Sequence, residues 1–129
     1  MKRFLFVLIV GFSSPLFAHA NHDDTPGNVT APHGGKMLSV AEIYLEVVKS
    51  DGSVKVYPVT HDLKAIALRD VKVSANVELP KQKKMSAELK NDGEFWTVKV
   101  DAKGGRRYTL FFDVAWKGKK GSTKYTIEQ

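Results

Sequence analysis

The chain of 129 residues contains no cysteine, and this absence limits how its fold can be stabilised. Small secreted domains commonly compensate for a limited core with disulfide bonds. Here the stability has to come from buried apolar side chains. Among exported proteins, a disulfide-free domain of this size is most typical of a bacterial periplasm.

No apolar run is long enough to span a membrane, which takes about 20 apolar residues. The run Phe4–Val10 follows a positive start at residues 1–3 and precedes a small-x-small site at residues 18–20. These are the parts of an export signal. We therefore expect residues 1–20 to be a cleaved signal peptide, with cleavage after Ala18 or Ala20. The mature chain is then periplasmic, with no stable membrane insertion.

A strong charge of one sign is also missing. The formal net charge of +6 falls to +4 when Lys2 and Arg3 leave with the signal. The basic runs at residues 81–84 and 117–120 fall where turns are expected, and there they keep strand edges in water. Nucleic-acid binding would need a focused basic stripe with interleaved aromatic residues, so we expect no nucleic-acid partner.

Catalytic motifs are absent as well. The sequence has no nucleophile elbow, no zinc-protease helix motif and no phosphate-binding glycine loop. Its glycine pairs at residues 34–35 and 104–105 lack the spacing and the following helix that hold phosphate. We therefore expect that the protein is not an enzyme.

What the sequence does contain is a series of short alternating apolar segments, separated by turn residues about every 8–12 positions. Residues 21–32 are polar and are expected to be a flexible N-terminal segment. Residues 33–129 predict one all-β domain, an immunoglobulin-like β-sandwich of two antiparallel sheets with seven to eight strands.

Period-two alternation sets the expected strand boundaries. The first two strands are separated by an Asp-Gly turn, which is typical of a tight hairpin. Residues 84–90 and 95–100 are expected to form a second hairpin. The expected strands cover residues 42–49, 54–59, 71–79, 84–90, 95–100, 107–116 and 122–128.

The segment with the most chemical promise is Ala-Pro-His-Gly-Gly at residues 31–35. Histidine is the commonest metal ligand in proteins, and two glycines let the backbone turn sharply and come close to a neighbour. One imidazole does not make a metal site, because zinc or copper normally takes three or four ligands. A turn histidine bonded to the backbone is an equally good interpretation of His33.

Candidate partners for His33 come from three places. Glu42 and Glu46 are expected on one face of the same strand, and His61 follows the next strand. His22 lies near the expected new N-terminus, whose free amine can hold Cu(II) together with an imidazole. The other interpretations stay open: solvent-facing carboxylates for the two glutamates, a turn residue for His61, and plain disorder around His22.

Three runs of residues resemble a known family. They are APHGGK at residues 31–36, EIYLEVV at 42–48 and GSVKVY at 52–57. They are similar to the small periplasmic domain with a Pro-His-Gly-Gly opening that occurs alone and at the N-terminus of some heavy-metal efflux adaptor proteins of the resistance-nodulation-division type. The resemblance implies a β-sandwich associated with export or buffering of copper or a divalent metal, with His33 and Glu46 at the matching positions.

The chain lacks the helical hairpin, the lipoyl-like half-motifs and the barrel of a complete adaptor. The hypothesis is therefore a freestanding periplasmic protein that binds copper or zinc through His33 and Glu46, with His61, Glu42 or His22. Its partners would be the metal ion and a heavy-metal efflux system or another periplasmic protein. The alternative is a structural or protein-interaction module in which His-Gly-Gly is only a turn. Both predict the same fold.

Overall fold

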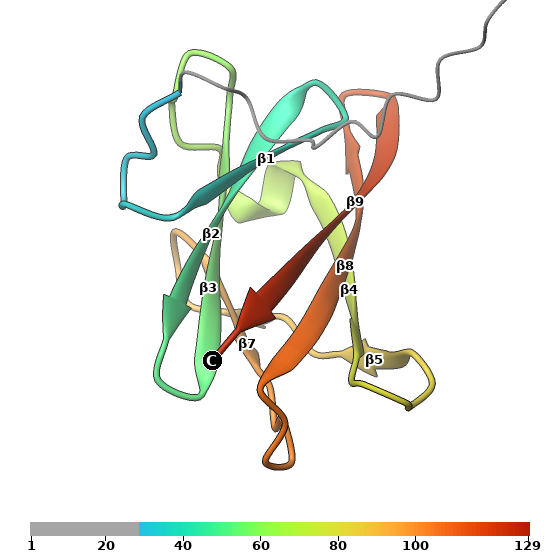
Figure 1. Ribbon diagram of the computed structural model, residues 1–129. Coiled ribbons are helices and arrows are strands. Elements are labelled where there is room, and N and C mark those ends of the chain that lie inside the picture. Colours follow the sequence, from blue (N-terminus) through green and yellow to red (C-terminus); the bar gives the residue numbers. More distant parts are fainter. Residues whose placement is uncertain (1–28) are drawn as a thin grey trace, which may run out of the picture.

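The computed structural model describes residues 29–129, and the expected signal peptide and His22 lie outside the described residues. Two antiparallel sheets pack face to face (Figure 1), so the predicted two-sheet β-sandwich is confirmed. The sheets hold nine strands within the described range, whereas we expected seven to eight. No helix in residues 29–129 is long and apolar enough to cross a membrane.

The first sheet has five strands in the order β1-β2-β3-β7-β6. Their bounds are β1 Lys36–Val40, β2 Ile43–Ser50, β3 Ser53–Val59, β7 Trp96–Lys99 and β6 Lys90–Asn91. Strand β1 was not among the strands expected from the sequence. Its consecutive residues Met37 and Leu38 are both buried although they point to opposite faces of the sheet. Strand β1 therefore lacks the alternation of buried and exposed residues that identifies the other strands.

The second sheet has four strands in the order β5-β4-β8-β9. Their bounds are β5 Met85–Ala87, β4 Lys72–Glu78, β8 Arg107–Trp116 and β9 Lys119–Glu128. A 3₁₀ turn, Leu68–Asp70, precedes β4. The chain thus crosses between the sheets after β3, after β5 and after β7.

The expected strand at residues 84–90 is divided between the two sheets. Its first part, β5, pairs with β4, and only Lys90 and Asn91 pair with β7. The predicted hairpin between residues 84–90 and 95–100 is therefore wrong for most of its length. The alternation at Met85 suggested a buried face, but Met85 is 41% exposed because this segment passes along the edge of the sandwich.

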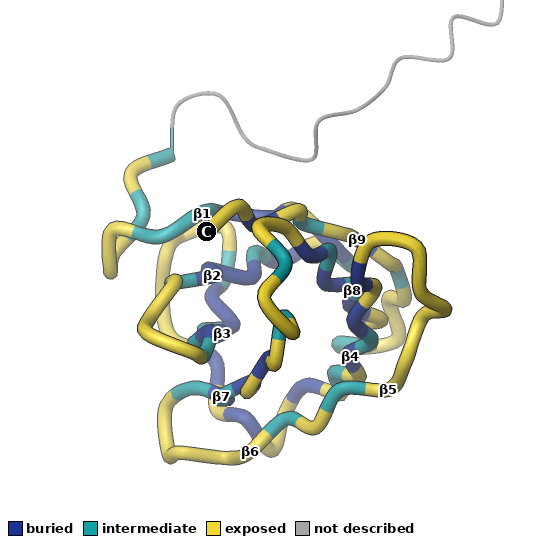
Figure 2. The backbone as a smooth tube through the Cα atoms, turned by 60° about the horizontal axis from the view of Figure 1, so that its bottom comes forward, coloured by how far each residue is buried: buried dark blue, intermediate teal, exposed yellow. Residues whose placement is uncertain are grey.

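The core lies between the sheets, and Figure 2 shows the buried stretches of the facing strands around the centre. Strand β8 follows the predicted alternation, because its inward residues are buried and the residues between them are not. The largest fully buried apolar side chains of this core are Ile43, Leu45, Val47, Val54, Val56, Val98, Leu110 and Phe112.

Strands β1 and β9, the edges of the two sheets, lie against each other (Figure 2). A Cβ on Gly121 would stand 3.1 Å from the backbone nitrogen of Ala41, so a larger residue there would push the two edges apart by a few tenths of an ångström. Lys119 Nζ lies 3.6 Å from Glu42 Oε1 at one end of β9. At the other end Lys49 Nζ donates to the carbonyl oxygen of Glu128 at 2.6 Å. The two long edges therefore protect each other.

Candidate functional site

Residues 31–35 form a short loop, which we call the strap, that lies on the outer face of the first sheet. The backbone N–H of Gly34 donates to the carbonyl of Ala31 at 3.1 Å, and Gly34 has φ +73°, in the left-handed region that favours glycine. Gly35 passes so close to β2 that a Cβ would stand 2.5 Å from the carbonyl oxygen of Val47. The backbone therefore favours glycine at position 34 through its φ and requires glycine at position 35 through its close approach to β2.

Glu46 is the residue that fixes the strap to the sheet. It lies on the face of β2 opposite the core, yet its side chain is 0% exposed. Oε1 accepts from the backbone N–H groups of His33 at 2.7 Å and Gly35 at 3.0 Å, and Oε2 accepts from His33 Nδ1 at 2.7 Å. A buried carboxylate is costly unless its oxygens are hydrogen-bonded, and here both are.

The hydrogen bond between His33 Nδ1 and Glu46 fixes the tautomer of the His33 ring. A carboxylate only accepts, so the hydrogen of the neutral imidazole is on Nδ1. Nε2 then carries a lone pair. The His33 side chain is 43% exposed, although its backbone is fixed on a fully buried group. The strap therefore presents an imidazole of defined tautomer at the protein surface.

Tyr57 supports the ring from below. Its ring centroid is 3.8 Å from that of His33 with an angle of 14° between the planes, and Phe95 lies 5.0 Å further along. In the sheet register Tyr57 stands opposite Glu46, and Glu46 stands opposite Met37. Burial, and then the charges of Glu46 and Glu94, raise the pKa of the Tyr57 phenol. At neutral pH Tyr57 therefore offers a ring face rather than a phenolate.

The other predicted residues lie elsewhere. Glu42 was expected on one strand face with Glu46, but β2 begins at Ile43, and Glu42 lies in the turn before it, exposed and beside Lys119. That placement is wrong because a tight turn, not a continuing strand, precedes Ile43. His61 follows β3 and lies against Tyr44, with ring centroids 4.6 Å apart.

The structure thus brings His33 and Glu46 together and leaves Glu42 and His61 outside this contact. Within residues 29–129 no group of three or more His, Cys, Asp or Glu side chains could hold a metal ion. Tyr57, which stacks on the imidazole, was not among the residues predicted for the site. The sequence does hint that Glu46 is a buried acceptor, since it is the one charged residue within the apolar run IYLEVV at residues 43–48.

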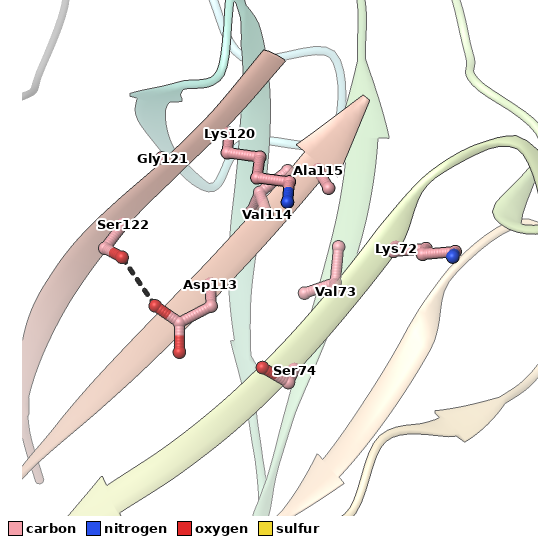
Figure 3. A pocket seen from close by; sticks show the side chains of 9 residues that line it. All are labelled: Lys72, Val73, Ser74, Asp113, Val114, Ala115, Lys120, Gly121 and Ser122. Atoms are coloured by element: carbon pink, nitrogen blue, oxygen red, sulfur yellow. Dashed lines mark hydrogen bonds between the residues drawn. The ribbon is translucent and has the colours of Figure 1, made fainter. Parts of the chain in front are cut away.

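A shallow hollow of about 530 Å³ lies on the outer face of the second sheet (Figure 3). Lys72 and Lys120 flank it, and Ser122 donates to Asp113 on its surface. This hollow is on the opposite side of the sandwich from the strap, and no histidine lines it. It has no part in the site around His33.

Comparisons with protein-family models, curated proteins and solved structures give no match for this chain. The resemblance to the efflux adaptor domain rests on short runs of sequence alone, namely the three given above and the closing runs GRRY at residues 105–108 and WKGK at 116–119. The function has to be argued from the contacts of His33 and Glu46.

Proposed function

We propose that this chain is a periplasmic, non-enzymatic protein that binds a transition-metal ion, copper or zinc, through His33. One arrangement supports the proposal: an imidazole whose Nδ1 donates to a buried carboxylate. Metal-binding histidines almost always donate their other ring N–H to a carboxylate, a carbonyl or water, which fixes the tautomer and raises the basicity of the ligand. His33 and Glu46 match the histidine and the carboxylate of such a triad.

In this proposal Glu46 is a positioning residue and Nε2 of His33 is the ligand. Both oxygens of Glu46 already accept bonds from the strap, and its side chain has no exposed surface. Direct coordination by Glu46 would require the strap to leave the sheet. The sequence hypothesis, which gave both residues the same role, is thereby refined into two different roles.

A single imidazole makes a weak site. Zinc and copper take three or four ligands, so water, His22 or a side chain of a donor protein would fill the other positions. Weak, incomplete coordination suits a protein that accepts a metal ion and passes it to an efflux system. It does not suit long-term storage.

Calorimetric titration of residues 21–129 with Zn(II) and Cu(II) tests the proposal. The informative variant is His33→Asn, because its amide N–H can take the place of Nδ1–H beside Glu46 while Nε2 is lost. We expect saturable Zn(II) binding to disappear in His33→Asn and to persist in the matched control His61→Asn, whereas Cu(II) held by the free N-terminus with His22 would remain in both variants. Glu46→Gln should weaken the affinity by roughly 10–100-fold. Zn(II) binding by His33→Asn that equals the wild type would rule the proposal out.

The second candidate is a structural or protein-interaction module without a metal role. The observation that favours it is that three hydrogen bonds fix the strap within the chain, so His-Gly-Gly has a structural use of its own. His33→Ala should lower stability under either function, so a loss of stability alone does not separate them. A partner that binds His33→Asn and the wild type equally in the presence of a chelator would establish this candidate.

A further inference from the structure

The turn between β1 and β2 adopts a conformation that its residues disfavour. Val40 pairs with Ile43, so only Ala41 and Glu42 form the loop, with φ values of +49° and +63°. Two-residue turns with both residues in the left-handed region strongly favour Asn-Gly or Asp-Gly, because a Cβ is unfavourable there. Neither Ala41 nor Glu42 is suited to this turn.

The other two-residue hairpin turns among the described strands are built differently. Asp51-Gly52 joins β2 to β3, and Lys117-Gly118 joins β8 to β9. Each places a glycine at its second position, with φ +67° and +76°. Among the two-residue hairpin turns within residues 29–129, only the β1–β2 turn lacks glycine; Leu63 and Lys81 also have positive φ, but each is a single residue in a longer loop.

This turn connects the sheet to a terminal arm, residues 29–40, which contains the strap and β1. In the sheet ladder β1 pairs with β2 alone. Its residues Met37, Leu38 and Val40 are buried, so an arm that left the sheet would expose a large apolar area. If the turn opens, the arm has to find an equivalent place on another copy.

We propose that the chain dimerises by exchanging this arm with a second copy. Ala41 and Glu42 extend, β1 continues into β2 as one long strand, and the arm pairs with the second copy's β2 in the register seen here. His33 of one copy then donates to the partner's Glu46, so each site contains residues of both chains. A short strained hinge is the kind that invites such swapping.

Exchange keeps the contacts of the arm and releases the strained turn. Two contacts of the hinge oppose opening. The ion pair of Glu42 with Lys119 is solvent-exposed on both sides and therefore weak. The half-buried Ala41 packs against the core beside Gly121. The inference does not rest on metal binding, because the strap contacts Glu46 through its own donors.

A cysteine pair reports the exchange directly, since the chain has no cysteine of its own. Ser39 stands opposite Tyr44 across β1 and β2, so Ser39→Cys with Tyr44→Cys forms a disulfide within one chain in the monomer and between chains in the swapped dimer. Residues 21–129 are refolded at increasing concentration, oxidised and resolved on a denaturing gel without reductant. We expect a cross-linked dimer whose fraction rises with concentration.

The hinge is tested in the same background by Ala41→Asn with Glu42→Gly, which supplies the favoured turn. We expect the association constant of the dimer to fall at least about tenfold, whereas Lys117→Asn, in a turn that is not the hinge, should leave it unchanged. Sedimentation of the wild-type chain is the second measurement. Monomer at every concentration, or equal cross-linking by Ser39→Cys alone, would overturn the proposal.

Discussion

On the second sheet the outward-facing side chains of β8 and β9 meet water, and they pair with one another as Thr109 does with Thr126 at 2.9 Å. On the first sheet the corresponding face is partly covered. The strap lies on Glu46 and Tyr57, and Met37 and Glu46 are buried although they point away from the core. The same strand alternation thus produces an open face on one sheet and a second, smaller buried cluster on the other.

This contrast shows what the His-Gly-Gly motif does for the fold. A carboxylate on the open face, such as Asp113, is exposed and needs no particular partner beyond Ser122. Glu46 is fully buried and depends on three donors that all come from the strap. Substitutions at matched positions on the two faces should therefore differ in cost.

The largest difference is expected for Glu46→Ala against Asp113→Ala. Removal of Glu46 leaves the donors of the strap without an acceptor, and each buried donor without a partner costs about 1–3 kcal/mol. We expect a loss of about 2–4 kcal/mol in the free energy of unfolding, with little change for Asp113→Ala. Denaturant unfolding of the two variants measures this, and equal losses would show that the strap is not fixed by Glu46.

The next largest difference in stability is expected between alanine substitutions at the two glycines of the strap. Gly35→Ala places a Cβ 2.5 Å from the carbonyl oxygen of Val47, so the backbone has to move. Gly34→Ala meets no atom within 4 Å and suffers only from its positive φ. We expect Gly35→Ala to cost about 1–3 kcal/mol and more than Gly34→Ala, as measured by thermal unfolding. The reverse order would place the strap further from β2.

A smaller effect is expected at His33. His33→Ala removes the hydrogen bond from Nδ1 to the buried carboxylate, and hydrogen bonds to charged groups contribute about 1.5–3 kcal/mol. Since the ring is partly exposed and water can replace it, we expect about 1–2 kcal/mol. His33→Asn should recover part of this loss in the same unfolding assay. An identical loss in both variants would mean that the Nδ1 contact adds no stability.

The smallest effect concerns the ring beneath His33. Tyr57→Leu removes the stacking partner, and aromatic pairs contribute about 0.5–1.5 kcal/mol beyond their burial. Phe111→Leu is the control, because Phe111 lies on the open face with Lys84 above its ring. Tyr57→Leu should lose more stability in His33-containing protein than in His33→Ala. A double-mutant cycle that shows no coupling between His33 and Tyr57 would mean that their stacking adds no stability.

Much of the fold follows from the sequence. The alternation in β8 places Leu110 and Phe112 in the core as predicted, and the Asp-Gly turn marks the β2–β3 hairpin. Strand β1 was not predictable by alternation, since Met37 is buried on the outer face of the first sheet while Leu38 is buried in the core between the sheets. Residues 84–90 were misread because a short edge segment can alternate without being buried.

The site was predictable only in part. The sequence selects His33 and Glu46, yet they are 13 positions apart, and their contact depends on how the strap returns over β2. Whether Glu46 would be a solvent-facing carboxylate or a buried acceptor depends on that same return. The local sequence pattern does not specify how the strap returns over β2. For Glu42 the pattern predicted a position within the strand, but the residue lies in the turn before β2.

The most direct test of the central claim is long-range ¹H–¹⁵N NMR of the imidazoles in residues 21–129, before and after addition of Zn(II). The account predicts that His33 carries its hydrogen on Nδ1 and that zinc shifts the Nε2 resonance while Nδ1 stays protonated against Glu46. A His33 ring protonated on Nε2, or one whose resonances do not respond to excess zinc, would contradict the claim that Glu46 prepares His33 for a metal ion.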